Sequence, residues 1–271
     1  MTRRYPRDVV VRDVGPRDGL QPEAPVAVAD RIRLVEALQD AGVRRIEVAA
    51  FVSPKAVPAM AGAAEVLAGI SRRPGATYAA LVPNLRGAEL ALAAGVDELT
   101  VTISASEAYN RRNVHMSTAE SEDQIAAVVE AAGGHVPVDA VVSCAFGSPY
   151  EGDVAPEDVA SLVRRLEGSG VTTVTCADTT GMATPRRVDD LLDSLGGRTD
   201  VGLHLHDTRG TALVNAYAAL ERGVARFDTA VGGLGGSPFA HGAGGNLATE
   251  SLVALLDDLG VATGISVEGL L

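Results

Sequence analysis

Short β-branched runs alternate with longer segments rich in Ala and Leu along the whole chain. Brief apolar runs are typical of buried strands, and apolar residues recurring every three or four positions are typical of helices. This pattern predicts strands over residues 9–14, 45–51, 77–83, 98–104, 138–146, 172–178, 201–206 and 226–232. It predicts helices over residues 28–41, 57–71, 85–94, 119–132, 156–169, 185–195, 211–222 and 246–259.

Eight strand–helix units in succession predict an α/β fold, a closed (β/α)8 TIM barrel. Such a barrel typically needs about 250 residues, and this chain has 271. No linker rich in Pro, Gly or Ser divides the units, so we expect one catalytic domain over residues 1–271. An open, doubly wound parallel sheet is the alternative, because it has the same alternation of strands and helices.

Composition narrows the classes of partner. Hydrophobic residues make up 46% of the chain and charged residues 21%, a balance typical of folded globular proteins. The net charge of −12 argues against nucleic acid as a partner. Cys144 and Cys176 are too few for a disulfide framework and are expected to be buried on strands. With no signal-peptide core or membrane span in the sequence, we expect a cytoplasmic protein without a membrane partner.

Metal-binding residue types gather where predicted strands end, which is where barrel active sites form. His204 and His206 alternate along one strand and therefore project from the same face. Asp18 follows the first strand and Asn246 follows the last. These four donors could cap one face of a divalent cation. Without a thiolate the set favours Mg²⁺ or Mn²⁺, and the imidazoles leave Zn²⁺ or Co²⁺ open. Taken alone, the two histidines could instead be unrelated, with one ring packed in the protein and the other solvated.

Several motifs then occur in the order found in one known family. Residues 13–21 (DVGPRDGLQ) resemble the opening signature of the DRE-TIM metallolyases, and more closely that of their 3-hydroxy-3-methylglutaryl-CoA (HMG-CoA) lyase branch. Further matching stretches are 46–47 (IE), 51–55 (FVSPK), 83–85 (PNL), 142–145 (VSCA), 149–152 (PYEG), 178–179 (DT), 204–208 (HLHDT), 233–240 (GLGGSPFA) and 245–250 (GNLATE). The resemblance covers roughly residues 9–271.

The resemblance implies a reaction and roles for named residues. The reaction is a metal-dependent retro-Claisen cleavage of HMG-CoA, or of a related 3-hydroxyacyl-CoA, to acetyl-CoA and acetoacetate. Asp18, His204, His206 and Asn246 match the family's metal ligands, and Arg17 would stabilise the enolate oxygen. Glu47 and Asp178 are the candidates for acid–base catalysis. The alternative for each is that it supports neighbouring groups in the site. The residues expected to contact the acyl-CoA substrate are Asp13, Gln21, Lys55, Arg111 and Arg112, the two arginines through CoA phosphates unless they form only a solvated pair.

One position departs from the family. The lyases carry a proton-handling cysteine where this chain has Ser237, and a hydroxyl is a far weaker acid than a thiol. His241, four residues later, could supply the proton, or could be a solvated loop residue without a role. The chain could therefore be a slow lyase, an enzyme for a different substrate, or a protein that has lost the activity.

Three functional hypotheses follow. A 3-hydroxyacyl-CoA lyase is preferred, because the related synthases usually carry long C-terminal extensions. An aldolase or Claisen-type enzyme acting on another hydroxy acid is second. A catalytically silent metal-binding paralogue is third, and the complete set of metal ligands argues against it. A homodimer is expected, since barrels of this family often pair.

Overall fold

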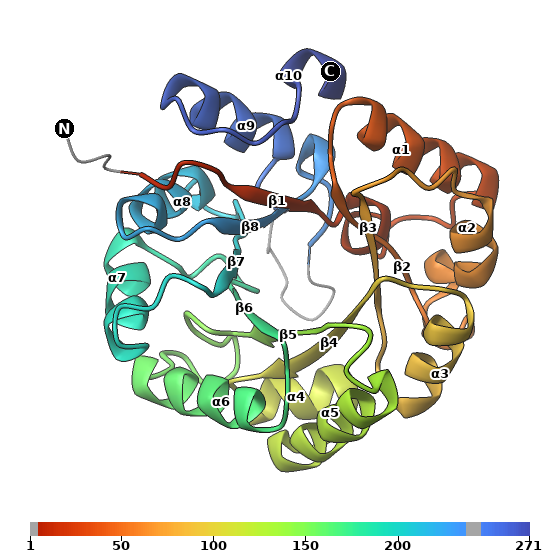
Figure 1. Ribbon diagram of the computed structural model, residues 1–271. Coiled ribbons are helices and arrows are strands. Elements are labelled where there is room, and N and C mark those ends of the chain that lie inside the picture. The colour runs from red at the N-terminus through yellow and green to blue at the C-terminus, as the bar shows by residue number, and fades with distance from the viewer. Residues whose placement is uncertain (1–4, 237–244) are drawn as a thin grey trace.

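The structure, a computed structural model, describes residues 5–236 and 245–271. Within this part of the chain, eight parallel strands pair in sequence order, and the last pairs with the first. Figure 1 shows the resulting barrel nearly end-on, with the helices forming a ring around the strands. The predicted (β/α)8 barrel is therefore confirmed, and the open sheet is excluded because β1 pairs with β8.

The strands are β1 (Val10–Asp13), β2 (Arg45–Ala50), β3 (Thr77–Leu81), β4 (Glu98–Ser104), β5 (Val138–Ser143), β6 (Thr173–Ala177), β7 (Gly202–His204) and β8 (Arg226–Thr229). The helices are α1 (Val28–Asp40), α2 (Ala63–Gly69), α3 (Leu85–Ala93), α4 (Glu107–Val114), α5 (Thr118–Ala132), α6 (Pro156–Gly168), α7 (Pro185–Ser194), α8 (Ala212–Glu221), α9 (Thr249–Asp258) and α10 (Val267–Leu270). Short helical turns lie at η1 (Gly15–Gly19), η2 (Pro58–Met60) and η3 (Val231–Gly233). No helix in the two described ranges has the length and apolarity needed to cross a membrane.

Several predicted boundaries were wrong for local reasons. The helix predicted over 57–71 divides into η2 and α2, because Gly62 adopts a left-handed φ of 77° between them. The helix predicted from residue 246 starts at Thr249, since Asn246 and Ala248 form bridges with residues near the ends of β7 and β8. Cys144 is not on a strand: it follows β5 with a φ of 57°. Both cysteines are buried, as expected.

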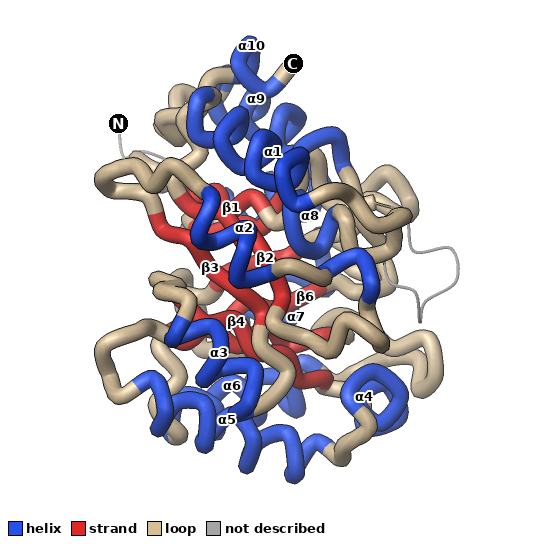
Figure 2. The backbone as a smooth tube through the Cα atoms, turned by 90° about the vertical axis from the view of Figure 1, so that its right-hand side faces the viewer, coloured by secondary structure: helices blue, strands red, loops and turns tan. Residues whose placement is uncertain are grey.

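Helix α4 was not predicted, and it lies outside the simple strand–helix alternation. Its sequence EAYNRRNV has almost no apolar positions, so it has no helical stripe to detect. The Ser106 side chain caps its start by accepting a hydrogen bond from the Tyr109 amide, and His115 ends it in a left-handed conformation. Figure 2, turned by 90°, shows α4 at the lower right of the molecule. It is linked to α5, because Asn110 Nδ2 donates to the Ser121 hydroxyl at 2.7 Å.

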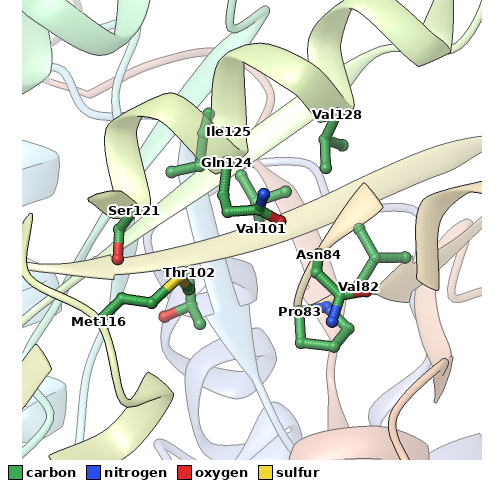
Figure 3. A pocket seen from close by; sticks show the side chains of 10 residues that line it. All are labelled: Val82, Pro83, Asn84, Val101, Thr102, Met116, Ser121, Gln124, Ile125 and Val128. Atoms are coloured by element: carbon green, nitrogen blue, oxygen red, sulfur yellow. The ribbon is translucent and has the colours of Figure 1, made fainter. Parts of the chain in front are cut away.

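The apolar core lies mainly between the strands and the surrounding helices, and Ile46, Leu99, Leu203 and Phe227 are fully buried within it. Packing there is close. A small pocket lies between β4 and α5 (Figure 3). Its volume is about 10 Å³. Such a volume is near the minimum for one water molecule. A substrate-sized space must therefore be sought elsewhere, and it lies at the ends of the strands.

Candidate active site

The turn after β1 places two functional side chains. In η1 the amides of Arg17, Asp18 and Gly19 all donate to the carbonyl of Val14, at 3.1, 2.7 and 3.2 Å. Gly19 permits a close approach of two loops, because a Cβ there would lie 2.9 Å from the Cβ of Leu234. This tight turn carries Arg17 and Asp18 over the mouth of the barrel.

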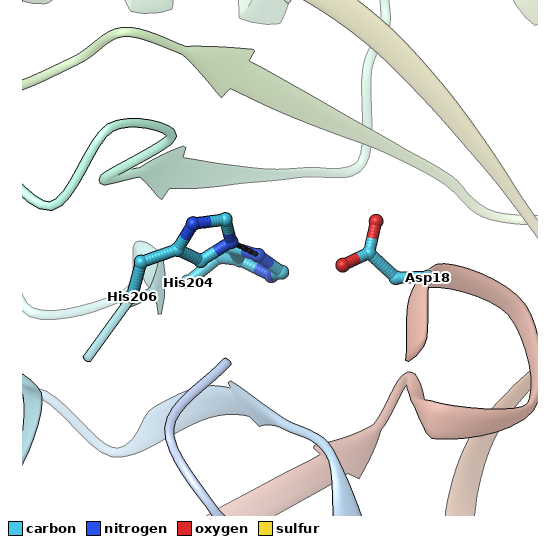
Figure 4. Close-up of side chains that lie close together, drawn as sticks. All are labelled: Asp18, His204 and His206. Carbon is cyan, nitrogen blue, oxygen red and sulfur yellow. Dashed lines mark hydrogen bonds between the residues drawn. The ribbon is translucent and has the colours of Figure 1, made fainter. Parts of the chain in front are cut away.

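Asp18 faces the two histidines that the sequence placed on one face (Figure 4). The Nε2 atoms of His204 and His206 lie 3.1 Å apart. One ligand atom from each ring and one carboxylate oxygen of Asp18 all lie within 4.8 Å of one another. Both histidines are buried, and Asp18 is half-buried. The predicted cluster of three metal ligands is therefore assembled.

Asn246 completes the group. Its Nδ2 atom donates to Asp18 Oδ2 and to the Leu234 carbonyl, each at 2.8 Å. Its amide oxygen is buried and finds no hydrogen-bond partner among the described residues, a costly condition unless something else binds it. Burial, together with the neighbouring His204, lowers the pKa of His206 to about 4, which keeps that ring neutral. A carboxylate, two imidazoles and a free amide oxygen fit a divalent cation.

Arg17 is held by two carboxylates. Its Nε donates to Glu47 Oε2 at 2.5 Å and its Nη1 to Asp18 Oδ1 at 2.7 Å. Although burial lowers the pKa of Arg17, Glu47 and Asp18 together raise it above its ordinary value, so the guanidinium keeps its charge. Glu47 is fully buried in β2 and reaches the site through Arg17.

Asp178 is also placed behind the site. Its Oδ1 accepts hydrogen bonds from the amides of Met182 and Ala183, at 2.7 and 3.0 Å. Burial raises its pKa to about 6 despite these bonds. Its neighbour Thr179, which sequence reasoning did not single out, lines the cavity instead. The positions of Glu47 and Asp178 favour a role in supporting neighbouring groups over direct acid–base catalysis.

Asp13, which was expected to contact substrate, is fully buried, and its carboxylate is occupied by protein groups. Gly15 donates its amide to Oδ1 at 2.8 Å, and Val231 and the Thr249 hydroxyl bind Oδ2 at 3.0 and 2.6 Å. Burial raises the pKa of Asp13 to about 6. It therefore ties β1 to the segment after β8 and to α9.

The other residues expected to contact substrate differ in whether they line the cavity. Gln21 lines the cavity, whereas Lys55 is exposed outside its wall. Arg111 forms an ion pair with Glu107 at 2.7 Å on the same helix. The Arg112 guanidinium lies 4.0 Å from the ring centre of Tyr150, a cation–π distance.

Ser237 and His241, the two predicted proton-transfer residues, lie outside the described residues.

The cavity at the strand ends has a volume of about 370 Å³, within the range of small-molecule sites. Arg17, Asp18, His204 and His206 form its polar end, and the rest of its wall includes side chains that the sequence did not single out: Val52, Val57, Leu81, Tyr109, His115, Val141, Ser143 and Asp228. Asp228 Oδ2 lies 3.4 Å from His204 Nδ1. Asp228 is the one carboxylate in the predicted strand 226–232, and this feature of the sequence could have identified it as a candidate site residue.

Comparison with known proteins bears on this geometry. The HMGL-like family model matches residues 8–271. The chain belongs to the HMGL-like family. Among curated members, it is 49% identical over 270 residues to the 3-hydroxy-3-isohexenylglutaryl-CoA/hydroxy-methylglutaryl-CoA lyase of Pseudomonas aeruginosa, covering 98% of this chain and 90% of that protein. It is 43% identical to the hydroxymethylglutaryl-CoA lyase of Bacillus subtilis, covering 98% and 91%.

Solved structures of HMGL-like lyases agree in fold. The structure of the B. subtilis HMG-CoA lyase matches with a TM-score of 0.95 at 43% identity, covering 98% of this chain and 91% of the other. An HMG-CoA lyase from Acinetobacter baumannii in complex with coenzyme A and 3-methylmalate matches with a TM-score of 0.91 at 41% identity, covering 97% and 88%. The recognition made from the motifs is confirmed.

We expect Mn²⁺ to raise the melting temperature of the wild-type protein, because a ligand that binds only the folded state stabilises it. His206→Ala should abolish most of this shift, since it removes one of the three clustered ligands. His135→Ala is the matched control, because His135 is exposed after α5. Thermal unfolding with and without Mn²⁺ measures both. An equal shift in wild type and His206→Ala would contradict the assigned site.

Proposed function

We propose that this HMGL-like protein is a divalent-metal-dependent carbon–carbon lyase that cleaves HMG-CoA, or a related 3-hydroxyacyl-CoA, releasing acetyl-CoA. From HMG-CoA the second product is acetoacetate. The cluster of Asp18, His204 and His206 beside Arg17, at one end of the cavity, is the observation that carries the proposal. We infer a single catalytic domain, since the family match spans residues 8–271.

The four residues Asp18, His204, His206 and Asn246 would hold the cation, with Mg²⁺ or Mn²⁺ preferred for this donor set. When bound, such a cation supplies Lewis-acid chemistry that lowers the pKa of a substrate hydroxyl. Asp18 also accepts from Arg17 and Asn246. These bonds fix the carboxylate before any ligand arrives.

Arg17 is placed to stabilise developing negative charge. When the bond between C2 and C3 of a 3-hydroxyacyl-CoA breaks, its electron pair passes into the thioester enolate, so charge grows on the thioester oxygen. Arg17 lies in the cavity wall with its guanidinium fixed by Glu47 and Asp18. A guanidinium that is already oriented stabilises this charge without reorganisation during the reaction. We infer that Glu47 acts mainly by orienting Arg17.

A direct cleavage assay tests the proposal. Metal-stripped protein is incubated with HMG-CoA, with and without Mg²⁺ or Mn²⁺, and acetyl-CoA and acetoacetate are quantified. We expect metal-dependent release of both products in equal amounts. A parallel reaction with 3-hydroxy-3-isohexenylglutaryl-CoA tests whether the cavity accepts a longer branch. Failure to cleave either thioester, with metal binding confirmed, would contradict the proposal and favour another hydroxy-acid substrate or a silent paralogue.

Arg112 is proposed to bind a phosphate of the CoA portion. The Tyr150 ring holds its guanidinium beside the cavity wall formed by Asn113, Val114 and His115. Arg112→Ala should therefore raise KM for the thioester several-fold and leave kcat nearly unchanged, because the phosphate is remote from the reacting bond. Arg165→Ala is the control, since Arg165 is exposed on α6 and pairs with Glu122. A lower kcat with unchanged KM in Arg112→Ala would contradict this role.

The serine at position 237 generates a separate expectation. If the missing thiol limits turnover, Ser237→Cys should raise kcat, because a thiol exchanges protons near neutral pH far more readily than a hydroxyl does. If His241 has taken over proton transfer, Ser237→Cys should give no gain and His241→Ala should give a large loss. Steady-state rates of the two variants decide between these expectations. Unchanged rates in both variants would contradict any proton-transfer role for these two residues.

We also propose that the protein acts as a cytoplasmic homodimer without nucleic-acid or membrane partners. The net negative charge argues against a nucleic-acid partner. The dimer is supported by the frequent pairing of related barrels. Sedimentation at the mass of one chain would contradict the dimer.

A further inference from the structure

A cluster of buried charges lies inside the barrel and reaches the metal-binding end. Arg12, in β1, has a side chain that is only 4% exposed. Its Nε and Nη2 atoms donate to the two carboxylate oxygens of Asp228, in β8, at 2.8 and 2.7 Å. Nη2 also lies 2.8 Å from an oxygen of Asp139, in β5, and Nη1 lies 3.1 Å from Glu98, in β4. One guanidinium thus contacts carboxylates from three other strands.

The three carboxylates differ in what else binds them. Glu98 also pairs with Arg45, and Asp139 accepts hydrogen bonds from the hydroxyls of Thr173 and Thr175. Asp228, by contrast, is bound by Arg12 and by His204 within the described part of the chain. Arg12 is therefore the cation on which Asp228 depends.

Asp228 connects this cluster to the proposed metal site. Its Oδ2 atom, which Arg12 Nη2 binds, lies 3.4 Å from His204 Nδ1. The opposite ring nitrogen of His204, Nε2, lies 3.1 Å from His206 Nε2, on the side facing Asp18. The ring of His204 therefore has one nitrogen toward the carboxylate and the other toward the proposed cation.

The paired contact with Arg12 decides what Asp228 can do for this ring. Both oxygens of Asp228 accept hydrogen bonds from the Arg12 guanidinium, an arrangement typical of an ionised carboxylate. An ionised carboxylate only accepts hydrogen bonds, so it keeps the His204 proton on Nδ1 and leaves a lone pair on Nε2. A neutral carboxyl group could donate instead, which would favour the tautomer with its proton on Nε2. That tautomer cannot bind a metal through Nε2.

We propose that Arg12 is a positioning residue for the metal site: by binding Asp228 through two hydrogen bonds, it fixes an acceptor that selects the Nδ1–H tautomer of His204 and so presents Nε2 to the cation. The metal site belongs to the proposed function, and the inference rests on it. Arg12 lies beneath the site and its role is to act through Asp228. Outer partners of metal-binding histidines commonly change metal affinity or activity by 10- to 100-fold.

Manganese affinity tests the inference without substrate. Free Mn²⁺ is titrated by electron paramagnetic resonance against wild type, Arg12→Met, Arg12→Lys and Arg45→Met, each checked for folding by circular dichroism. Arg12→Met should weaken Mn²⁺ binding about 10- to 100-fold, and Arg12→Lys should recover part of it. Arg45→Met is the matched control, since it removes a cation from the same cluster without touching Asp228, and it should bind as wild type does. Unchanged affinity in folded Arg12→Met would overturn the inference, even if its melting temperature falls.

The tautomer of His204 provides a second test that does not depend on the folding of Arg12→Met. Long-range ¹H–¹⁵N spectra of ¹⁵N-histidine-labelled, metal-free protein at alkaline pH report which nitrogen carries the proton, and His204→Gln identifies the signal. Wild type should show the proton on Nδ1, and Asp228→Leu should lose that preference. A wild-type His204 protonated on Nε2 would overturn the inference by itself. Absence of Mn²⁺ binding in wild type with the Nδ1–H tautomer present would instead contradict the proposed metal-dependent function.

Discussion

Closure of the barrel between β1 and β8 is the constraint on which the site depends. Four residues of β1 pair in register with four of β8, from Val10 with Arg226 to Asp13 with Thr229. This pairing brings the turn after β1 beside the ends of β7 and β8. The hydrogen bond between Asp18 and Asn246 spans 228 positions of the chain. Without closure, the ligands contributed by the first and last strands would have no common centre.

The charged side chains around the proposed metal site are arranged in pairs of opposite charge. Arg12 balances carboxylates inside the barrel, and Arg17 is fixed by Glu47 and Asp18 nearer the mouth. Burying an unpaired charge is far more costly than burying a paired one. Among the buried polar atoms that have no partner in the described structure, the amide oxygen of Asn246 is informative, because the same side chain is hydrogen-bonded to Asp18 in the ligand cluster. A bound cation accounts for both the clustered ligands and this free oxygen.

Much of this arrangement follows from the sequence. Alternation of apolar runs identified the strands, and residue types at strand ends identified Asp18, His204, His206 and Asn246 as a group, because parallel strands bring their carboxyl ends to one mouth. Periodicity could not find α4, whose residues are mainly polar. The helix predicted over 57–71 failed because Gly62 interrupts it, a backbone effect that a hydrophobic pattern does not report.

Partners contributed by distant strands were the least predictable part of the site. Asp13 was expected to face substrate, yet it binds Val231 and Thr249 inside the protein, and the direction of a carboxylate at a strand end depends on such neighbours. Arg12 and Asp228 likewise acquire a role only when β1 and β8 lie side by side. The type of a residue at a strand end therefore identifies it as a candidate for the site, whereas its role there depends on its tertiary contacts.

The position of a bound cation tests the proposed metal site most directly. We would collect anomalous diffraction data from crystals grown with Mn²⁺. We expect one strong manganese peak at the barrel mouth, ligated by Asp18, His204, His206 and the amide oxygen of Asn246. A peak elsewhere, or none at this cluster despite saturating Mn²⁺, would contradict the claim that barrel closure assembles a metal-dependent active site.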